Sequence, residues 1–88
     1  MKVDEICERY SEKSVGLALR LLEEDDGSPP STVLIEGSAR ALRFLAALLI
    51  AIADEGEDES FSITPFGAGK FHFSEVSELG VYIHRVPE

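Results

Sequence analysis

Residues 38–54 read SARALRFLAALLIAIAD, the longest apolar stretch of the chain and the one that decides the fold. Most of its residues are good helix formers. Ser38 is a suitable N-cap, because its hydroxyl can accept a hydrogen bond from the first turn. Gly56 follows at a position where a left-handed residue commonly ends a helix. The stretch therefore predicts one central helix over residues 38–54.

This helix has two apolar sides. At about 100° per residue, five aliphatic residues share the first side, which we expect to face a sheet. They are Leu42, Leu45, Leu48, Leu49 and Ile52. The opposite side would be polar in an ordinary surface helix, but here it is largely apolar. Either another segment of the chain or a second protein covers it.

The second side of the helix supplies the candidate contact residues for a partner. Its small side chains would let another backbone approach closely. Its two arginines lie near the positive end of the helix dipole, which opposes their charge. They would be neutralised by nearby carboxylates or by an external anion. The candidate partner-binding residues are Arg40, Arg43, Phe44, Ala47 and Ile50.

Length and composition predict a single domain over residues 1–88, with 44% apolar residues and therefore a globular fold. Cys7 is the single cysteine, which excludes an intramolecular disulfide and fits a reducing compartment. Acidic residues rather than an apolar run follow Met1, so we expect no signal peptide. The apolar run 44–53 is about half the ~20 residues that a bilayer requires. We therefore expect a cytoplasmic protein without membrane contact.

The net charge is −9, and two acidic clusters account for it. Phosphate contacts need clustered Lys and Arg, so the charge argues against nucleic acid as a partner. An acidic surface can attract a basic protein, or it can simply keep the protein soluble. The clusters are Glu23, Glu24, Asp25 and Asp26, and then Asp54, Glu55, Glu57, Asp58 and Glu59.

The rest of the chain predicts one short helix and several strands. Apolar residues at spacings of three and four predict an amphipathic helix over residues 2–13. Residues 15–23 alternate as a strand would, although a helix continuing from the N-terminus is also compatible with them. We predict an α+β fold of two layers, with one mainly antiparallel sheet packed on the central helix. Its five short strands are 15–23, 32–36, 60–64, 70–74 and 81–86.

Candidate chemistry is sparse, and we predict neither catalysis nor a cofactor. The only histidines are His72 and His84, which would be neighbours if the last two strands pair. Together with a cysteine or a carboxylate they could bind zinc, but the sequence has no closely spaced ligand pair. The alternative is that both are surface histidines beside core aromatic residues.

Three short segments carry a resemblance to a protein class: Ile35-Glu36-Gly37-Ser38, the helix pattern Leu42-x-x-Leu45-Ala46-x-Leu48-Leu49, and Gly80-Val81-Tyr82-Ile83-His84-Arg85. Over residues 31–87 the chain is similar to small uncharacterised bacterial proteins that resemble predicted immunity proteins of bacterial toxin systems. The resemblance implies a non-enzymatic binder that would cover a toxin, and it supplies no catalytic residues.

The sequence thus favours a non-enzymatic domain that binds a protein of unknown identity, either immunity-like or as a homodimer. The alternative function is a domain that binds a small ligand or a metal through His72 and His84.

Overall fold

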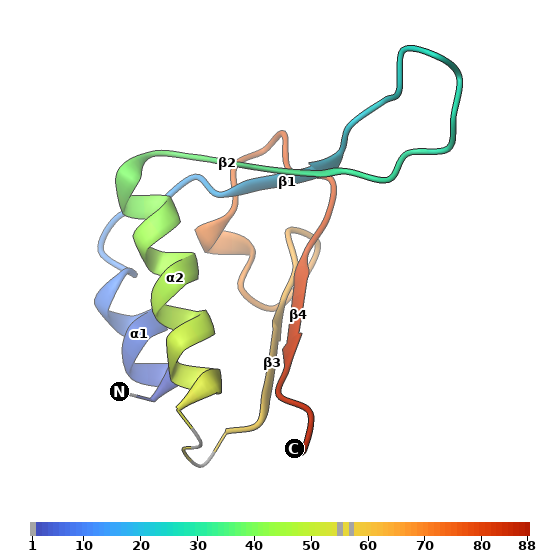
Figure 1. Ribbon diagram of the computed structural model, residues 1–88. Helices are drawn as coiled ribbons and strands as arrows, with labels where there is room; N and C mark the ends of the chain where they lie inside the picture. The colour runs from blue at the N-terminus through green and yellow to red at the C-terminus, as the bar shows by residue number, and fades with distance from the viewer. Residues whose placement is uncertain (1, 55, 57) are drawn as a thin grey trace.

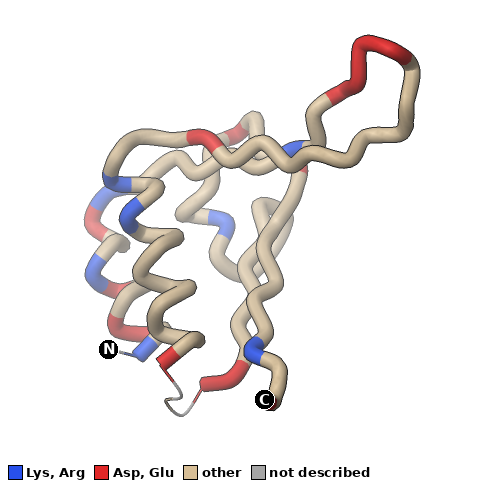
Figure 2. The backbone as a smooth tube through the Cα atoms, viewed as in Figure 1, with Lys and Arg blue, Asp and Glu red and all other residues tan. Residues whose placement is uncertain are grey.

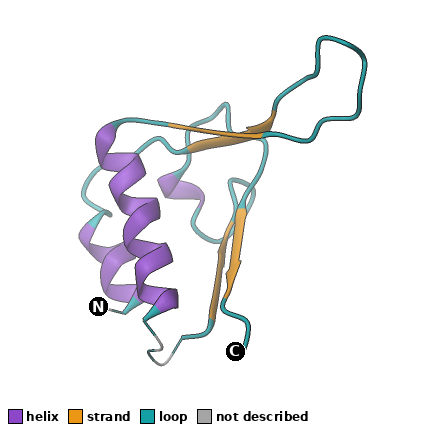
Figure 3. Ribbon diagram, in the orientation of Figure 1, coloured by secondary structure: helices purple, strands orange, loops and turns teal. Residues whose placement is uncertain are grey.

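The structure is a computed structural model that describes residues 2–54, 56 and 58–88. It is an α+β fold, which confirms the predicted class (Figures 1 and 3). In chain order the elements are α1 (Val3–Arg9), β1 (Ala18–Leu21), β2 (Val33–Glu36), α2 (Ala39–Ala53), β3 (Ser60–Ile63), the short 3-10 helix η1 (Lys70–His72) and β4 (Val81–His84).

The predicted single sheet of five strands is wrong. The described strands form two separate two-stranded antiparallel sheets, β1–β2 and β3–β4. The hairpin expected between residues 15–23 and 32–36 is present, with Leu19 opposite Ile35 and Leu21 opposite Val33. Residues 15–23 therefore contain a strand rather than a helix. The two hairpins run in different directions in Figure 1, with β1–β2 across the top and β3–β4 beside α2.

The strand predicted over residues 70–74 is also wrong. Residues 70–72 form η1, and Phe73 makes only a single parallel bridge to Leu17. The reason lies at Gly69, whose φ of 83° turns the chain against β3, where any Cβ would collide with Ile63. Two local hydrogen bonds, from His72 N–H to Gly69 O and from Phe73 N–H to Lys70 O, then replace ladder bonds. β3 consequently pairs with β4 instead.

α1 is shorter than the predicted helix 2–13. It ends at Arg9, where the Ser11 hydroxyl and the Ser11 N–H both donate to Glu8 O, at 2.6 and 3.1 Å. A serine that bonds the backbone locally competes with further helical bonds. The chain then extends toward Val15 and passes through Gly16, which has a φ of 67°.

The two ends of α2 are stabilised differently. Ser38 is the N-cap, as predicted, and its Oγ accepts a hydrogen bond of 3.2 Å from Ala41 N–H. The C-terminal end lacks basic residues of its own. There Arg85, which follows β4, donates from Nη1 to Ile52 O at 2.6 Å. A distant residue thus brings positive charge to the negative end of the helix dipole.

The core is centred on a different side of α2 than the periodicity predicts. Its most buried line is Ala41, Phe44, Leu48 and Ile52, with at most 1% exposure. Leu45 is also buried, but Leu42 and Leu49 stay about half exposed. The N-terminal segment covers part of the second apolar side of α2, because Tyr10, which follows α1, packs on Phe44 with 5.2 Å between ring centroids. Arg43 and Ile50 on that side stay exposed.

The loop between β1 and β2 projects from the body of the molecule and carries acidic residues near its end (Figure 2). The radius of gyration is 13.9 Å, whereas a compact chain of this length has about 12 Å. The solvent-accessible surface is 6127 Å², compared with about 5,100 Å² for a compact monomer of this mass. The fold therefore leaves an unusual amount of surface open. No helix among residues 2–54, 56 and 58–88 is long and apolar enough to cross a membrane.

Candidate protein-binding site

The predicted contact residues do not form one open surface. Phe44 is fully buried against Tyr10 and His72, so its ring belongs to the core and is not available to a partner. The guanidinium of Arg40 lies 4.7 Å from the centre of the Tyr10 ring, which gives it a cation–π contact within the chain. α1 therefore occupies much of the surface that the sequence assigned to a partner.

The remaining predicted residues lie further out. Ala47 is half-buried, whereas Arg43 and Ile50 are exposed. Ala47 and Ile50 border a shallow depression that Ile6 and Arg9 of α1 also line. Only Arg43, Ile50 and the rim of this depression are therefore left of the predicted surface.

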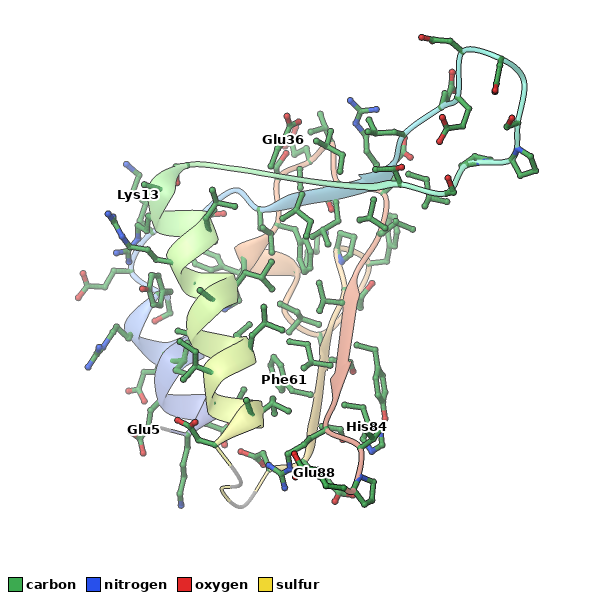
Figure 4. All side chains as sticks on the ribbon, viewed as in Figure 1. Glu5, Lys13, Glu36, Phe61, His84 and Glu88 are labelled. Atoms are coloured by element: carbon green, nitrogen blue, oxygen red, sulfur yellow. The ribbon has the colours of Figure 1, made fainter. Side chains whose placement is uncertain are left out.

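The two histidines lie in different environments. His72 is 7% exposed and stacks on Phe44 with 4.5 Å between ring centroids. Burial lowers the pKa of His72, and its Nδ1 has no hydrogen-bond partner. His84 is exposed and points away from α2 at the end of β4 (Figure 4). Within the described ranges, no group of three or more His, Cys, Asp or Glu residues could hold a metal ion.

Cys7 is partly buried and packs against the core cluster. Burial raises the pKa of its thiol, and the nearby Asp4 carboxylate raises it further. A thiol in this environment is a poor nucleophile, because the reactive form is the thiolate. Cys7 is therefore a packing residue, which agrees with its apolar neighbours in the sequence.

The first acidic cluster lies on the projecting loop. Ser28 N–H donates to Asp26 Oδ1 at 2.9 Å, and hydrogen bonding to Ser28 lowers the pKa of Asp26. The Ser31 hydroxyl donates to Glu24 Oε1 at 3.3 Å across the base of the loop. In the second cluster, Glu55 and Glu57 fall outside the described residues.

A further open surface lies elsewhere, on α2 and the first hairpin. We call it the apolar face. Because Leu21 stands opposite Val33 and Leu19 opposite Ile35, these four side chains share one side of the hairpin. Leu19 belongs to the core, but the other three stay exposed. The face comprises five large aliphatic residues, each 44–49% exposed: Leu21, Val33, Ile35, Leu42 and Leu49.

The two parts of the apolar face adjoin the same core cluster. Leu45 lies one turn from both Leu42 and Leu49, and it belongs to the same buried cluster as Leu19 of β1. Phe61 points from β3 toward α2 and also packs against this cluster (Figure 4). The exposed leucines therefore border the core, where a partner would extend it.

The periodicity of α2 does not predict this face, because it places Leu42 and Leu49 on the side expected to pack on a sheet. One signal could have revealed it. Leu42, Ala46, Leu49 and Ala53 recur at spacings of four, three and four, and all four are exposed. An apolar line of this spacing is typical of a helix that faces another protein segment.

Comparisons of the chain with protein-family models, with curated proteins and with solved structures found no match.

Proposed function

We propose that the protein acts by binding another protein through the apolar face, without catalysing a reaction. One observation carries the proposal. Five large aliphatic side chains of a small domain lie about half exposed around one border of its core. Single exposed apolar residues are ordinary, but a contiguous group of them marks an interaction surface.

The free energy available from burying the apolar face suits a weak, reversible complex. Fully burying one such side chain contributes about 1.5–3 kcal/mol. Covering five that are already half-buried would contribute about 4–7 kcal/mol before the costs of association. Association itself costs about 4 kcal/mol or more, so the apolar contacts alone leave little net affinity. Backbone hydrogen bonds or charge pairs at the rim would have to supply any further affinity.

Neither the immunity resemblance nor the alternative function adds a second candidate. The resemblance stays a prediction from the sequence, and it would make the partner a toxin. In the described part of the chain no contact joins His72 to His84, so ligand or metal binding through both has no observation in its favour.

Site-specific photo-cross-linking in the native host tests the proposal. A photoreactive amino acid replaces Leu49 on the apolar face or, as a matched control, Tyr82, which is exposed on β4. We expect one discrete adduct from position 49 and none from position 82. The same experiment with Leu42→Glu introduced should lose the adduct, because a carboxylate in the interface is costly to desolvate. Equal labelling at both positions, or none at position 49, would overturn the proposal.

A further inference from the structure

Building on the proposed function, we propose that the partner is a second copy of this chain. The two copies pair antiparallel along the free edge of β2, so that two hairpins join into one four-stranded sheet. The apolar faces then meet on the same side of this sheet. The free edge means the backbone groups of β2 that point away from β1.

The hydrogen bonds of the hairpin define this edge. Leu22 N–H donates to Thr32 O at 2.8 Å, which makes residues 22 and 32 a bonded pair. Bonded and non-bonded pairs alternate along an antiparallel ladder. Leu34 and Glu36 therefore bond to β1, whereas the N–H and C=O groups of Val33 and Ile35 point outward. Among the described residues none makes a hydrogen bond to these outward groups.

The edge is complementary to itself. A two-fold axis at Leu34 places Val33 of one copy opposite Ile35 of the other, and the reverse. Both are outward-bonding positions, so each pair exchanges two backbone hydrogen bonds. Leu34 then stands opposite its own counterpart as a non-bonded pair. Glu36 stands opposite Thr32, so no like charges oppose each other across the strands.

The edge also lacks two features that usually prevent such pairing. Edge strands of monomeric proteins often carry lysine or proline, or they are short, charged, bulged or covered. Residues 32–36 read TVLIE, with neither lysine nor proline. The prolines Pro29 and Pro30 lie beyond them, in the projecting loop. The protection left to β2 is its length of four residues and the charge of Glu36 at its end. A second copy that keeps Glu36 opposite Thr32 is compatible with this edge.

Charge placement agrees with a symmetric pair. Antiparallel pairing directs the two projecting loops to opposite ends, which separates the clusters Glu23–Asp26. A two-fold axis perpendicular to the sheet keeps both apolar faces on one side.

Sedimentation equilibrium of the purified chain gives the first test. We expect dimers at a concentration of about 1 mM, which is high enough to populate a dimer with a Kd of about 1 mM or tighter. Added salt should tighten the dimer, because each copy carries a net charge of −9 and salt screens the repulsion. A strictly monomeric protein at high concentration and high salt would overturn the proposal.

Charge exchange tests the register. Val33→Lys alone and Ile35→Glu alone should each weaken the dimer about tenfold or more, because each change occurs twice across the axis. The double variant V33K/I35E should regain most of the lost affinity, since opposite charges then face each other in both pairs. Any arrangement that places position 33 opposite itself predicts no recovery. Circular dichroism checks that each variant stays folded.

A disulfide test works even if charged variants unfold. In a Cys7→Ser background, Leu34→Cys should give a covalent dimer on mild oxidation, because the two introduced thiols face each other at the axis. Tyr82→Cys, which is exposed on β4, is the control and should stay monomeric. Equal cross-linking of both variants would contradict the pairing.

The two proposals fail in different ways. If the photo-adduct from position 49 contains a different protein and the isolated chain is monomeric, protein binding stands and self-pairing falls. If the chain dimerises but Leu42→Glu and Leu49→Glu leave the dimer and the adducts unchanged, the apolar face is not the binding surface.

Discussion

β1 and β2 are four-residue strands of one hairpin and have similar apolar sequences, yet they lie in different environments. The outer edge of β1 is bonded at Leu19 and, just before the strand, at Leu17. Leu17 bonds to His72 and Ser74, and Leu19 bonds to Ser77, Glu78 and Leu79. The outer edge of β2 is free within the described residues, and Val33 and Ile35 are half exposed.

Segment 72–79 makes this difference. It has no regular strand, but it covers β1 with a parallel bridge, one turn and the hydroxyl of Ser77. Among the described residues no corresponding segment reaches β2. The contrast shows that whether a strand lies in the core or at a free edge depends on which other segments of the chain pack beside it. Four experiments test this difference.

The largest effect is expected from removing the buried member of a cross-strand pair. Leu19 and Ile35 face each other, but only Leu19 is buried. Leu19→Ala should lower the free energy of unfolding by about 2–5 kcal/mol, because it opens a cavity in the core. Ile35→Ala should cost clearly less at concentrations where the chain is monomeric. Urea denaturation measures both, and equal losses would contradict the contrast.

The next effect concerns the cover of β1. Ser77 Oγ accepts from Leu19 N–H at 3.0 Å and donates to Leu79 O at 3.0 Å. Ser77→Ala leaves the buried Leu19 N–H without a partner, so we expect a loss of about 1–3 kcal/mol. Ser62→Ala, on the exposed side of β3, should change the stability by at most about 0.5 kcal/mol. Thermal unfolding of the two variants makes the comparison directly.

A third effect is confined to acid. Burial holds the pKa of His72 below its ordinary value of 6.5, so the folded state keeps the imidazole neutral while the unfolded state takes up a proton. Stability is therefore complete above about pH 6.5 and falls as the pH drops toward the lowered pKa. Because Leu17 N–H bonds to His72 O, protonation should loosen the cover of β1 first.

Hydrogen exchange of the Leu17 and Leu19 amides between pH 7 and pH 5 measures this loosening. His72→Phe should flatten the pH dependence, whereas His84→Gln, at an exposed position, should leave it unchanged. A profile that stays the same in the His72 variant would show that another group is responsible.

The smallest effect is expected on the free edge. Val33→Thr keeps the β-branched shape of a half-exposed side chain, so the stability of the monomer should change by about 0.5 kcal/mol or less. Its effect on self-association should be larger than its effect on folding, because the substituted position occurs twice in the dimer. Sedimentation and urea denaturation of the same sample separate the two quantities.

The elements with local signals could be predicted from the sequence alone. Ser38 begins α2 because a side-chain hydroxyl caps the first turn, and this depends on neighbouring residues alone. The first hairpin, the α+β class and the position of Cys7 in apolar surroundings also followed from short-range pattern. Apolar periodicity predicted that α2 has two apolar sides, and the structure shows that the N-terminal segment covers part of the second.

Which side chains stay exposed to solvent depends on the tertiary structure. By periodicity, Leu42 and Leu49 belong to the side of α2 that faces the core. The sheet expected to cover them is split into two hairpins. The most buried residues of α2 are instead Ala41, Phe44, Leu48 and Ile52. Residues 70–74 alternate like a strand, yet Gly69 and the contact with Ile63 turn them into η1. Burial is set by contacts between residues far apart in the chain, and no local pattern specifies those contacts.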